Sequence, residues 1–221
     1  IIHRAYYGVR PLSTKSGKPT NAIFGMVNMI SRQLDALKPE YAAVAFDLKA
    51  PTFRHKLYAD YKAGRRPTPE DLVAQFDDAK EVLQAMGLHI LTLAGYEADD
   101  IQGTVAHMAH GVADTESFVF SGDRDLLQLI DDKITVLLAT NTETIPMHEK
   151  EFREKYGIPS SEFVDMKALM GDSSDNIPGV AGIGEKTAAT LIAAFGSLEG
   201  IYEHIDDPVI KKGVREKLLA D

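Results

Sequence analysis

The sequence predicts an α/β protein with a parallel sheet, on three observations. Four short apolar runs, at 41–47, 88–93, 117–123 and 134–139, indicate buried strands because they are continuous rather than alternating. Helical patterns lie before and between them, at about 20–37, 69–86, 98–110 and 124–130, and such alternation is typical of a parallel sheet covered by helices. After about residue 148, short helical segments and Gly/Pro-rich turns predict a smaller helical appendage.

The composition limits the classes of function. With 24 Lys and Arg against 33 Asp and Glu, the 221-residue chain has a net charge of −9, which argues against nucleic-acid binding over its whole surface but allows a local basic stripe. The absence of cysteine leaves carboxylates and seven histidines as metal ligands. No apolar run approaches the roughly 18 residues of a membrane span, so we expect a cytoplasmic protein that does not bind membranes.

Acidic residues follow three of the predicted strands. The carboxyl ends of parallel strands meet at one edge of a sheet, where ligands bind. Each acid alone could cap a helix or a turn, but clustered carboxylates need a counter-charge, and Mg²⁺ or Mn²⁺ suits a set of oxygen ligands. Two further aspartates in the appendage bring the set to a size that favours two ions, as in metal-dependent phosphodiester cleavage. The set is Asp47, Glu97, Asp99, Asp100, Asp123, Asp125, Asp172 and Asp175.

A basic segment follows Asp47. Residues 49–66 carry six basic side chains against one acidic side chain, a local charge of +5, with Phe53, Tyr58 and Tyr61 interleaved. A solvated helix face would have a similar composition. The position beside a candidate metal ligand, and the reversal of charge sign, favour a clamp for a nucleic-acid strand.

The stretch "IPGVAGIGEKTAATLIAAFGS" predicts a helix–hairpin–helix, although a plain turn between helices is the alternative. We expect a first helix within 161–170, a hairpin at 179–184, and a second helix at 185–194 that ends at Gly196. Free backbone N–H groups at a helix start hold phosphates without reading sequence. Asp172 and Asp175 lie just before this hairpin, and they need not repel a phosphate if they hold a metal ion.

Six stretches of the chain match one family in order, and they cover nearly its whole length. They are "HRAYYG", "FDLKAPTFRHKLYADYKAGRRPTPED", "GYEADD", "SGDRDLLQL", "YGIPSSEFVDMKALMGDSSDNIPGVAGIGEKTA" and "FGSLEGIY". The chain thus resembles the 5′ nuclease (5′-3′ exonuclease) domain of bacterial DNA polymerase I and the flap endonuclease family. The resemblance implies a PIN-like core at 1–157, with a helical arch at about 49–80, and a helix–hairpin–helix subdomain at 158–221.

The resemblance also implies an activity and its residues. The activity would be Mg²⁺-dependent 5′-3′ exonuclease and flap endonuclease cleavage near single-strand/duplex junctions, in primer removal during replication and repair. Asp47, Glu97, Asp99 and Asp100 would serve one ion, and Asp123, Asp125, Asp172 and Asp175 the other. Lys62 and Arg65 would contact the scissile phosphate, so the catalytic set is Lys62, Arg65, Asp47 and Asp123. The DNA-binding set is Arg54, Lys56, Tyr61, Arg66, Gly179, Gly182, Gly184, Lys186 and Thr187.

Further expectations concern partners and the hairpin. Tyr61 resembles an arch aromatic near the entering strand, and Gly182 to Lys186 resemble a backbone contact assisted by K⁺. The partner would be DNA with a 5′ flap, a nick or a 5′ end, including an RNA primer. The chain would act as a monomer or as the N-terminal part of a DNA polymerase.

One departure from the family leaves a second function open. The family begins with a strand ending in Asp-Gly, whereas this chain starts at Ile1, after that motif. The alternative is therefore a catalytically impaired, structure-specific DNA-binding fragment. A PIN-type ribonuclease is disfavoured because such enzymes usually lack the hairpin, and a dehalogenase-like phosphatase because "GDRDLL" comes too late in the chain.

Overall fold

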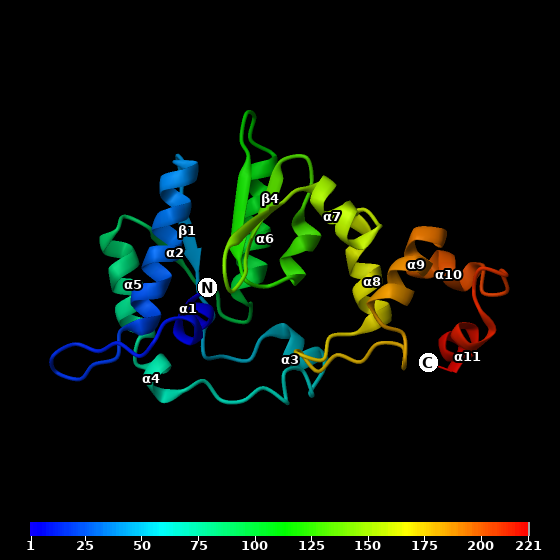
Figure 1. The fold of residues 1–221 in the computed structure, drawn as a ribbon, viewed down its shortest axis with the longest axis horizontal. Helices are drawn as coiled ribbons and strands as arrows, with labels where there is room; N and C mark the ends of the chain where they lie inside the picture. The colour runs from blue at the N-terminus through cyan, green and yellow to red at the C-terminus, as the bar shows by residue number, and fades with distance from the viewer. Residues whose placement is uncertain (221) are drawn as a thin grey trace.

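The computed structural model describes residues 1–220 as a mixed α/β protein (Figure 1). The strands are β1 (Ala43–Ala45), β2 (His89–Leu91), β3 (Ser117–Ser121), β4 (Ile134–Ala139) and β5 (Thr144–Met147). The helices up to β4 are α1 (Ile2–Gly8), α2 (Asn21–Leu37), α3 (Phe53–Leu57), α4 (Glu70–Val73), α5 (Phe76–Ala85), α6 (Ala98–His110) and the 3₁₀ helix η1 (Asp125–Leu129). The later helices are α7 (Glu149–Tyr156), the 3₁₀ helix η2 (Ser160–Glu162), α8 (Phe163–Met170), α9 (Glu185–Phe195), α10 (Leu198–Glu203) and α11 (Lys212–Ala220).

The strands form two hydrogen-bonded groups. β1 pairs with β2 in parallel, with Ala43 opposite His89, and β3 pairs with β4 in parallel, with Ser117 opposite Ile134. The predicted parallel α/β core is therefore confirmed. β5 adds an antiparallel edge to β4 and was not predicted, because it is short and contains Pro146, a residue confined to strand edges and ends.

A wide cleft separates the two strand groups. Within residues 1–220, β1 and β3 each pair with a partner on one edge only. A cleft of about 2770 Å³ is lined by Ala43–Ala45 on one side and by Ser117–Ser121 on the other. Helix α6 packs against both β1 and β3, and Ile1 lies beside the gap between the two halves (Figure 1). The carboxyl ends of β1 and β3 therefore border the same opening.

The buried core is divided at this cleft. One cluster joins α1, α2, β1, α4 and α5 through side chains such as Met26, Leu72 and Leu83. The other runs from Val136 of the second strand group through Leu169 of α8 and the helices that follow it. The core thus continues across the boundary we expected near residue 157. None of the helices in residues 1–220 is long and apolar enough to cross a bilayer.

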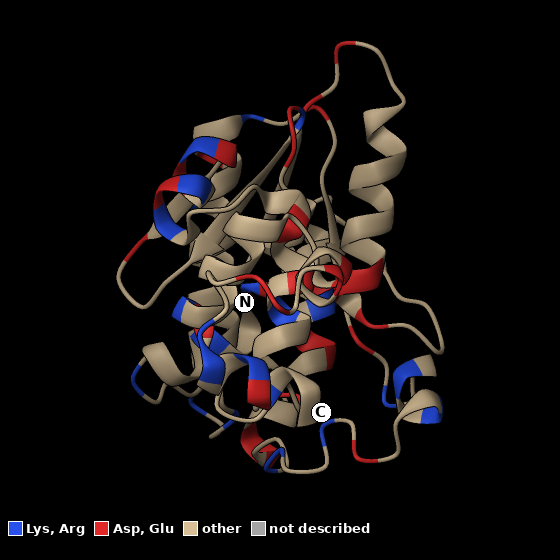
Figure 2. Ribbon diagram, turned by 90° about the vertical axis from the view of Figure 1, so that its right-hand side faces the viewer, with Lys and Arg blue, Asp and Glu red and all other residues tan. Residues whose placement is uncertain are grey.

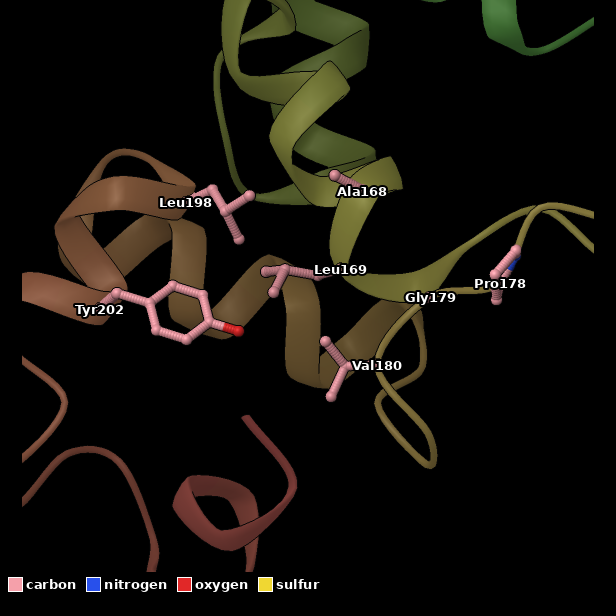
Figure 3. A pocket seen from close by; sticks show the side chains of 7 residues that line it. All are labelled: Ala168, Leu169, Pro178, Gly179, Val180, Leu198 and Tyr202. Atoms are coloured by element: carbon pink, nitrogen blue, oxygen red, sulfur yellow. The ribbon is translucent and has the colours of Figure 1, made fainter. Parts of the chain in front are cut away.

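The helical part contains the predicted helix–hairpin–helix. Helix α8 leads into a loop that closes on itself, with Asp172 N and Ile177 N donating to each other's carbonyl oxygens at 2.8 Å. The hairpin then packs against α8 and α10 around a small apolar pocket lined by Leu169, Val180, Leu198 and Tyr202 (Figure 3). Helix α9 ends at Gly196, whose φ is +80°, as expected for a glycine C-cap.

Gly179 holds the hairpin tightly against the end of α8. A Cβ at Gly179 would lie 2.2 Å from the backbone nitrogen of Gly171 and 2.4 Å from the carbonyl carbon of Met170. We expect Gly179→Ala to lower the free energy of unfolding by about 1–3 kcal/mol, the usual cost of overpacking, measured by urea denaturation. Gly184→Ala is the matched control, because a Cβ there meets no atom within 4 Å. Equal stability of the two variants would contradict the tight packing.

Candidate metal and nucleic-acid site

The acids predicted at the strand ends converge beside α6. Burial, together with repulsion by Asp123, Asp47 and Glu97, raises the pKa of Asp99 to about 7. Carboxylates from three strand ends therefore lie near enough to disfavour the charged form of Asp99.

The start of α6 positions the acids around it. Glu97 is the N-cap, and its backbone nitrogen donates to Asp100 Oδ2 at 2.9 Å, forming a capping box. Ala98 N donates to Asp47 Oδ1 at 2.7 Å, so the positive helix terminus orients the acid that follows β1. Asp99 consequently faces Asp47 and Asp123. Asp100 caps the helix and is held by Arg54.

The acids of the predicted second set lie where η1 meets the loop after α8. Asp123 Oδ1 accepts from Asp125 N at 3.0 Å, and Asp172 Oδ1 accepts from Ser174 N at 2.8 Å. Lys167 Nζ lies 3.0 Å from Asp125 Oδ1 and 2.6 Å from Asp172 Oδ2. Burial favours a higher pKa for Asp172, but hydrogen bonds from Lys167 and Ser174 outweigh it and lower the pKa. For Asp125, burial prevails and raises the pKa.

The basic segment after β1 lies on these carboxylates. Arg54 makes two hydrogen bonds to Asp100, at 2.7 and 2.8 Å, and the contact raises the pKa of Arg54. Lys62 Nζ lies 2.8 Å from both carboxylate oxygens of Glu97, and Arg65 pairs with Asp175. Acidic and basic parts of the ribbon accordingly interleave around the N-terminus (Figure 2). The expected arch at about 49–80 is helical only at α3, at α4 and at the start of α5, and it closes over the acids through ion pairs.

Tyr61 connects the two groups of acids. Its hydroxyl donates to Glu97 Oε2 and to Asp175 Oδ2, each at 3.0 Å. Burial and these hydrogen bonds raise its pKa. Only 5% of Tyr61 is exposed, so its ring is covered in this structure and does not offer a surface on which a base could stack.

Lys62 ties the arch to the helical part. Its backbone nitrogen donates to the carbonyl of Asp175 at 2.9 Å, and Asn176 Nδ2 donates to the carbonyl of Asp60 at 2.8 Å. Lys62 has φ +59°, an uncommon conformation for a residue with a side chain, and such strained residues cluster at functional sites. The position of the Lys62 ammonium is therefore fixed relative to both Glu97 and Asp175.

Most of the remaining residues of the predicted DNA-binding set are exposed. Lys56 and Arg66 are exposed on the arch, and Gly182, Gly184 and Lys186 are exposed on the hairpin. Gly182 has φ +75°, which favours glycine, and Gly184 is the N-cap of α9. Thr187 is half-buried, and its backbone nitrogen donates to the carbonyl of Gly184 at 3.0 Å.

Two lysines at the site were not predicted. Lys167 bridges Asp125 and Asp172, and Lys217 of α11 donates to the carbonyl of Gly182 at 2.8 Å. Lys167 is five residues from Asp172 with a turn at Gly171 between them, and Lys217 is 35 residues from Gly182. Neither spacing is a helix or strand repeat, so the sequence carried no signal for these contacts.

The carboxylate set fits hard divalent cations, because it offers only oxygen donors and already attracts ammonium groups. The eight acids nevertheless lie too far apart here to form a compact ligand group. Within residues 1–220, one group of three possible ligand side chains has ligand atoms within 4.8 Å of one another. It consists of His110, Asp131 and Asp132, and so includes none of the eight acids. It was not predicted, and it lies at the far end of α6 from Glu97, about 20 Å away along a 13-residue helix. Exposed acids are common without an ion, so we assign this group no role.

Comparison with known proteins gives the family. The family model "5'-3' exonuclease, N-terminal resolvase-like domain" matches residues 1–157, and "5'-3' exonuclease, C-terminal SAM fold" matches residues 158–221. The chain therefore belongs to the 5′-3′ exonuclease family.

The relatives are bacterial DNA polymerases I. The chain is 45% identical to the thermostable DNA polymerase I of Thermus filiformis over 222 residues, covering 100% of this chain and 26% of that protein. It is 44% identical to DNA polymerase I of Bacillus subtilis over 223 residues, covering 99% of this chain and 25% of that protein. The chain thus spans about a quarter of the length of these relatives.

A solved structure supports the fold. A structure of T5 5′-exonuclease with bound divalent metal ions (zinc) matches with a TM-score of 0.78 and 26% identity. The match covers 93% of this chain and 78% of that chain.

Proposed function

We propose that this chain is a divalent-metal-dependent 5′ nuclease that hydrolyses DNA phosphodiesters near single-strand/duplex junctions, in primer removal during replication and repair. The arrangement of Asp47, Glu97 and Asp123 around the half-buried Asp99 carries the proposal. Family membership supports nuclease activity, and a related T5 flap endonuclease is described in complex with DNA and metal ions.

The carboxylates would hold two Mg²⁺ or Mn²⁺ ions. Asp47, Glu97, Asp99 and Asp100 form the first set, and Asp123, Asp125, Asp172 and Asp175 the second. When bound, such ions activate water and stabilise the attacking and leaving oxygens of an in-line displacement. In the first set, Asp100 would have to release Arg54 before it could bind an ion. Asp99 would only have to lose a proton, because its raised pKa favours the protonated form.

Lys62 and Arg65 would neutralise charge on the scissile phosphate. Both lie on the arch, at the carboxylates, with side-chain exposures of 20% and 49%. A phosphate entering between the arch and the acids would compete with Glu97 and Asp175 for these two cations. Preorganised positive groups of this kind stabilise the charge that develops in phosphoryl transfer. Tyr61 would hold Glu97 and Asp175 in place, and Arg54, Lys56 and Arg66 would bind the backbone of the entering strand.

The hairpin would grip the duplex backbone. Gly179 lets it pack close to α8, while Gly182, Gly184, Lys186 and Thr187 present backbone amides and an ammonium at the start of α9. K⁺ would assist this backbone contact at the hairpin. The partner would be DNA with a 5′ flap, a nick or a 5′ end, including an RNA primer. The chain would function as the N-terminal part of a DNA polymerase or alone in the cytoplasm, with nuclease and hairpin parts meeting near residue 157.

The hairpin assignment predicts a defined effect of salt. We expect Lys186→Ala to weaken binding of a 5′-flap duplex severalfold, and to reduce the slope of log K against log salt by about one, because one phosphate contact is lost. Lys150→Ala on α7 removes an exposed ammonium outside the hairpin and is expected to leave the slope unchanged. Fluorescence anisotropy over a salt series measures both. Equal slopes for the two variants would remove Lys186 from the interface.

A second candidate function is structure-specific DNA binding without cleavage. It is favoured by the separation of the eight acids, which form no compact group of three ligands within residues 1–220. Flap cleavage in Mg²⁺, compared with EDTA, separates the two candidates.

A further inference from the structure

Lys167 occupies a position between two carboxylates of the proposed second ion. Its ammonium lies 3.0 Å from Asp125 Oδ1 and 2.6 Å from Asp172 Oδ2. Asp125 begins η1, whereas Lys167 lies on α8 and Asp172 follows the turn after α8, so Asp125 is distant in sequence from the other two residues. The Lys167 ammonium thus joins an acid of residues 1–157 to an acid of residues 158–221, the two regions that the family models match.

In Asp172, the oxygen that Lys167 contacts is the one that accepts no hydrogen bond from Ser174. Asp172 Oδ1 already accepts from Ser174 N at 2.8 Å and from Ser174 Oγ at 2.7 Å, so Oδ2 is the oxygen turned toward positive charge. The side chains of Lys167 and Asp172 are 24% and 16% exposed, so solvent neutralises this pair only in part. Lys62 and Arg65 also face the acids of the second set, but both pair with Asp175.

We propose that Lys167 is the internal counter-ion of the second metal position. In the metal-free chain its ammonium neutralises Asp125 and Asp172 and holds them together, and a divalent ion binds these oxygens by displacing it. The lysine stem is flexible, so the ammonium can leave without a backbone movement. This inference rests on the proposed function, because it assumes that these acids hold an ion.

The competition has two measurable consequences. In Lys167→Met the ion no longer competes with an ammonium, so we expect Mn²⁺ to bind one site roughly tenfold more tightly. This change in affinity corresponds to the free energy of one charge-assisted hydrogen bond. In EDTA the same variant leaves Asp125 and Asp172 without their counter-ion, so its melting temperature should fall. Saturating Mn²⁺ should then raise its melting temperature more than that of the wild type.

Calorimetric Mn²⁺ titration and thermal unfolding, with and without EDTA, measure these effects on the 221-residue chain. Lys211→Met is the matched control, because Lys211 is exposed and its ammonium makes no ion pair within residues 1–220. Lys167→Gln is a second variant that removes the charge but keeps a donor to Asp172, so it retains the packing if the methionine variant unfolds. The tighter Mn²⁺ binding should appear in Lys167→Gln as well.

The outcomes separate this inference from the proposed function. Unchanged or weaker Mn²⁺ binding in the Lys167 variants, with normal binding by the wild type, would overturn the counter-ion role. Equal losses of melting temperature with and without Mn²⁺ would also overturn it, because they indicate a purely structural lysine. If the wild type itself binds no Mn²⁺, the metal-dependent function fails, and that result is read from the wild type alone.

Discussion

Asp123→Ala is expected to lower the rate of flap cleavage by about 10²–10⁴-fold while leaving flap binding measurable. Asp123 follows β3 at the carboxylate cluster, where it raises the pKa of Asp99 by repulsion. An ion held there contributes several kcal/mol to the transition state, and each 1.36 kcal/mol is a factor of ten in rate. Single-turnover cleavage at saturating enzyme gives the rate, and anisotropy in Ca²⁺ gives the binding.

The loss of cleavage should not come from unfolding. Removing one of several clustered carboxylates relieves repulsion on Asp99, so the melting temperature in EDTA should stay the same or rise. Asp132→Ala, at the far end of α6 and on a side chain that is 81% exposed, is the matched acidic control and should cleave normally. Wild-type turnover by Asp123→Ala would contradict the two-ion assignment.

Lys62→Ala is expected to slow single-turnover cleavage by about 10²-fold, the usual effect of removing one preorganised group that stabilises transition-state charge. Its ammonium lies 2.8 Å from Glu97 and 3.8 Å from Asp175, so a phosphate at the ions would be within its reach. The measurement is the cleavage rate at saturating enzyme, where weaker binding no longer limits the rate.

Lys56→Ala provides the comparison for Lys62. Lys56 is exposed on the same basic segment and away from the carboxylates, so its loss should weaken flap binding and spare the saturated rate. If the two variants have the same saturated rate, Lys62 acts only in binding and lies outside the active site.

Local patterns predicted most of the elements but not how they meet. Helix α6 was predicted at its observed bounds because an acidic N-cap precedes a regular apolar repeat. The helix expected at 69–86 is divided into α4 and α5 at Gln75, whose buried side chain accepts from Ala22 N at 2.9 Å and donates to Asn21. That division depends on a contact more than 50 residues away, which no local pattern contains.

The candidate site shows the same limit. The strand-end rule correctly placed Asp47, Asp99 and Asp123 together, since it depends only on strand direction. It could not distinguish Asp99, which faces those acids, from Asp100, which caps α6 and pairs with Arg54. Similarly, the bridge made by Lys167 requires α8 to pack beside η1, so it emerges only from the folded chain.

The most direct test of a metal-dependent 5′ nuclease is cleavage of a 5′-flap duplex by the 221-residue chain, in Mg²⁺ and in EDTA, with products sized on a denaturing gel. We predict cleavage near the junction in Mg²⁺ and none in EDTA. Specific flap binding without cleavage in Mg²⁺ would contradict nuclease activity and favour the DNA-binding alternative.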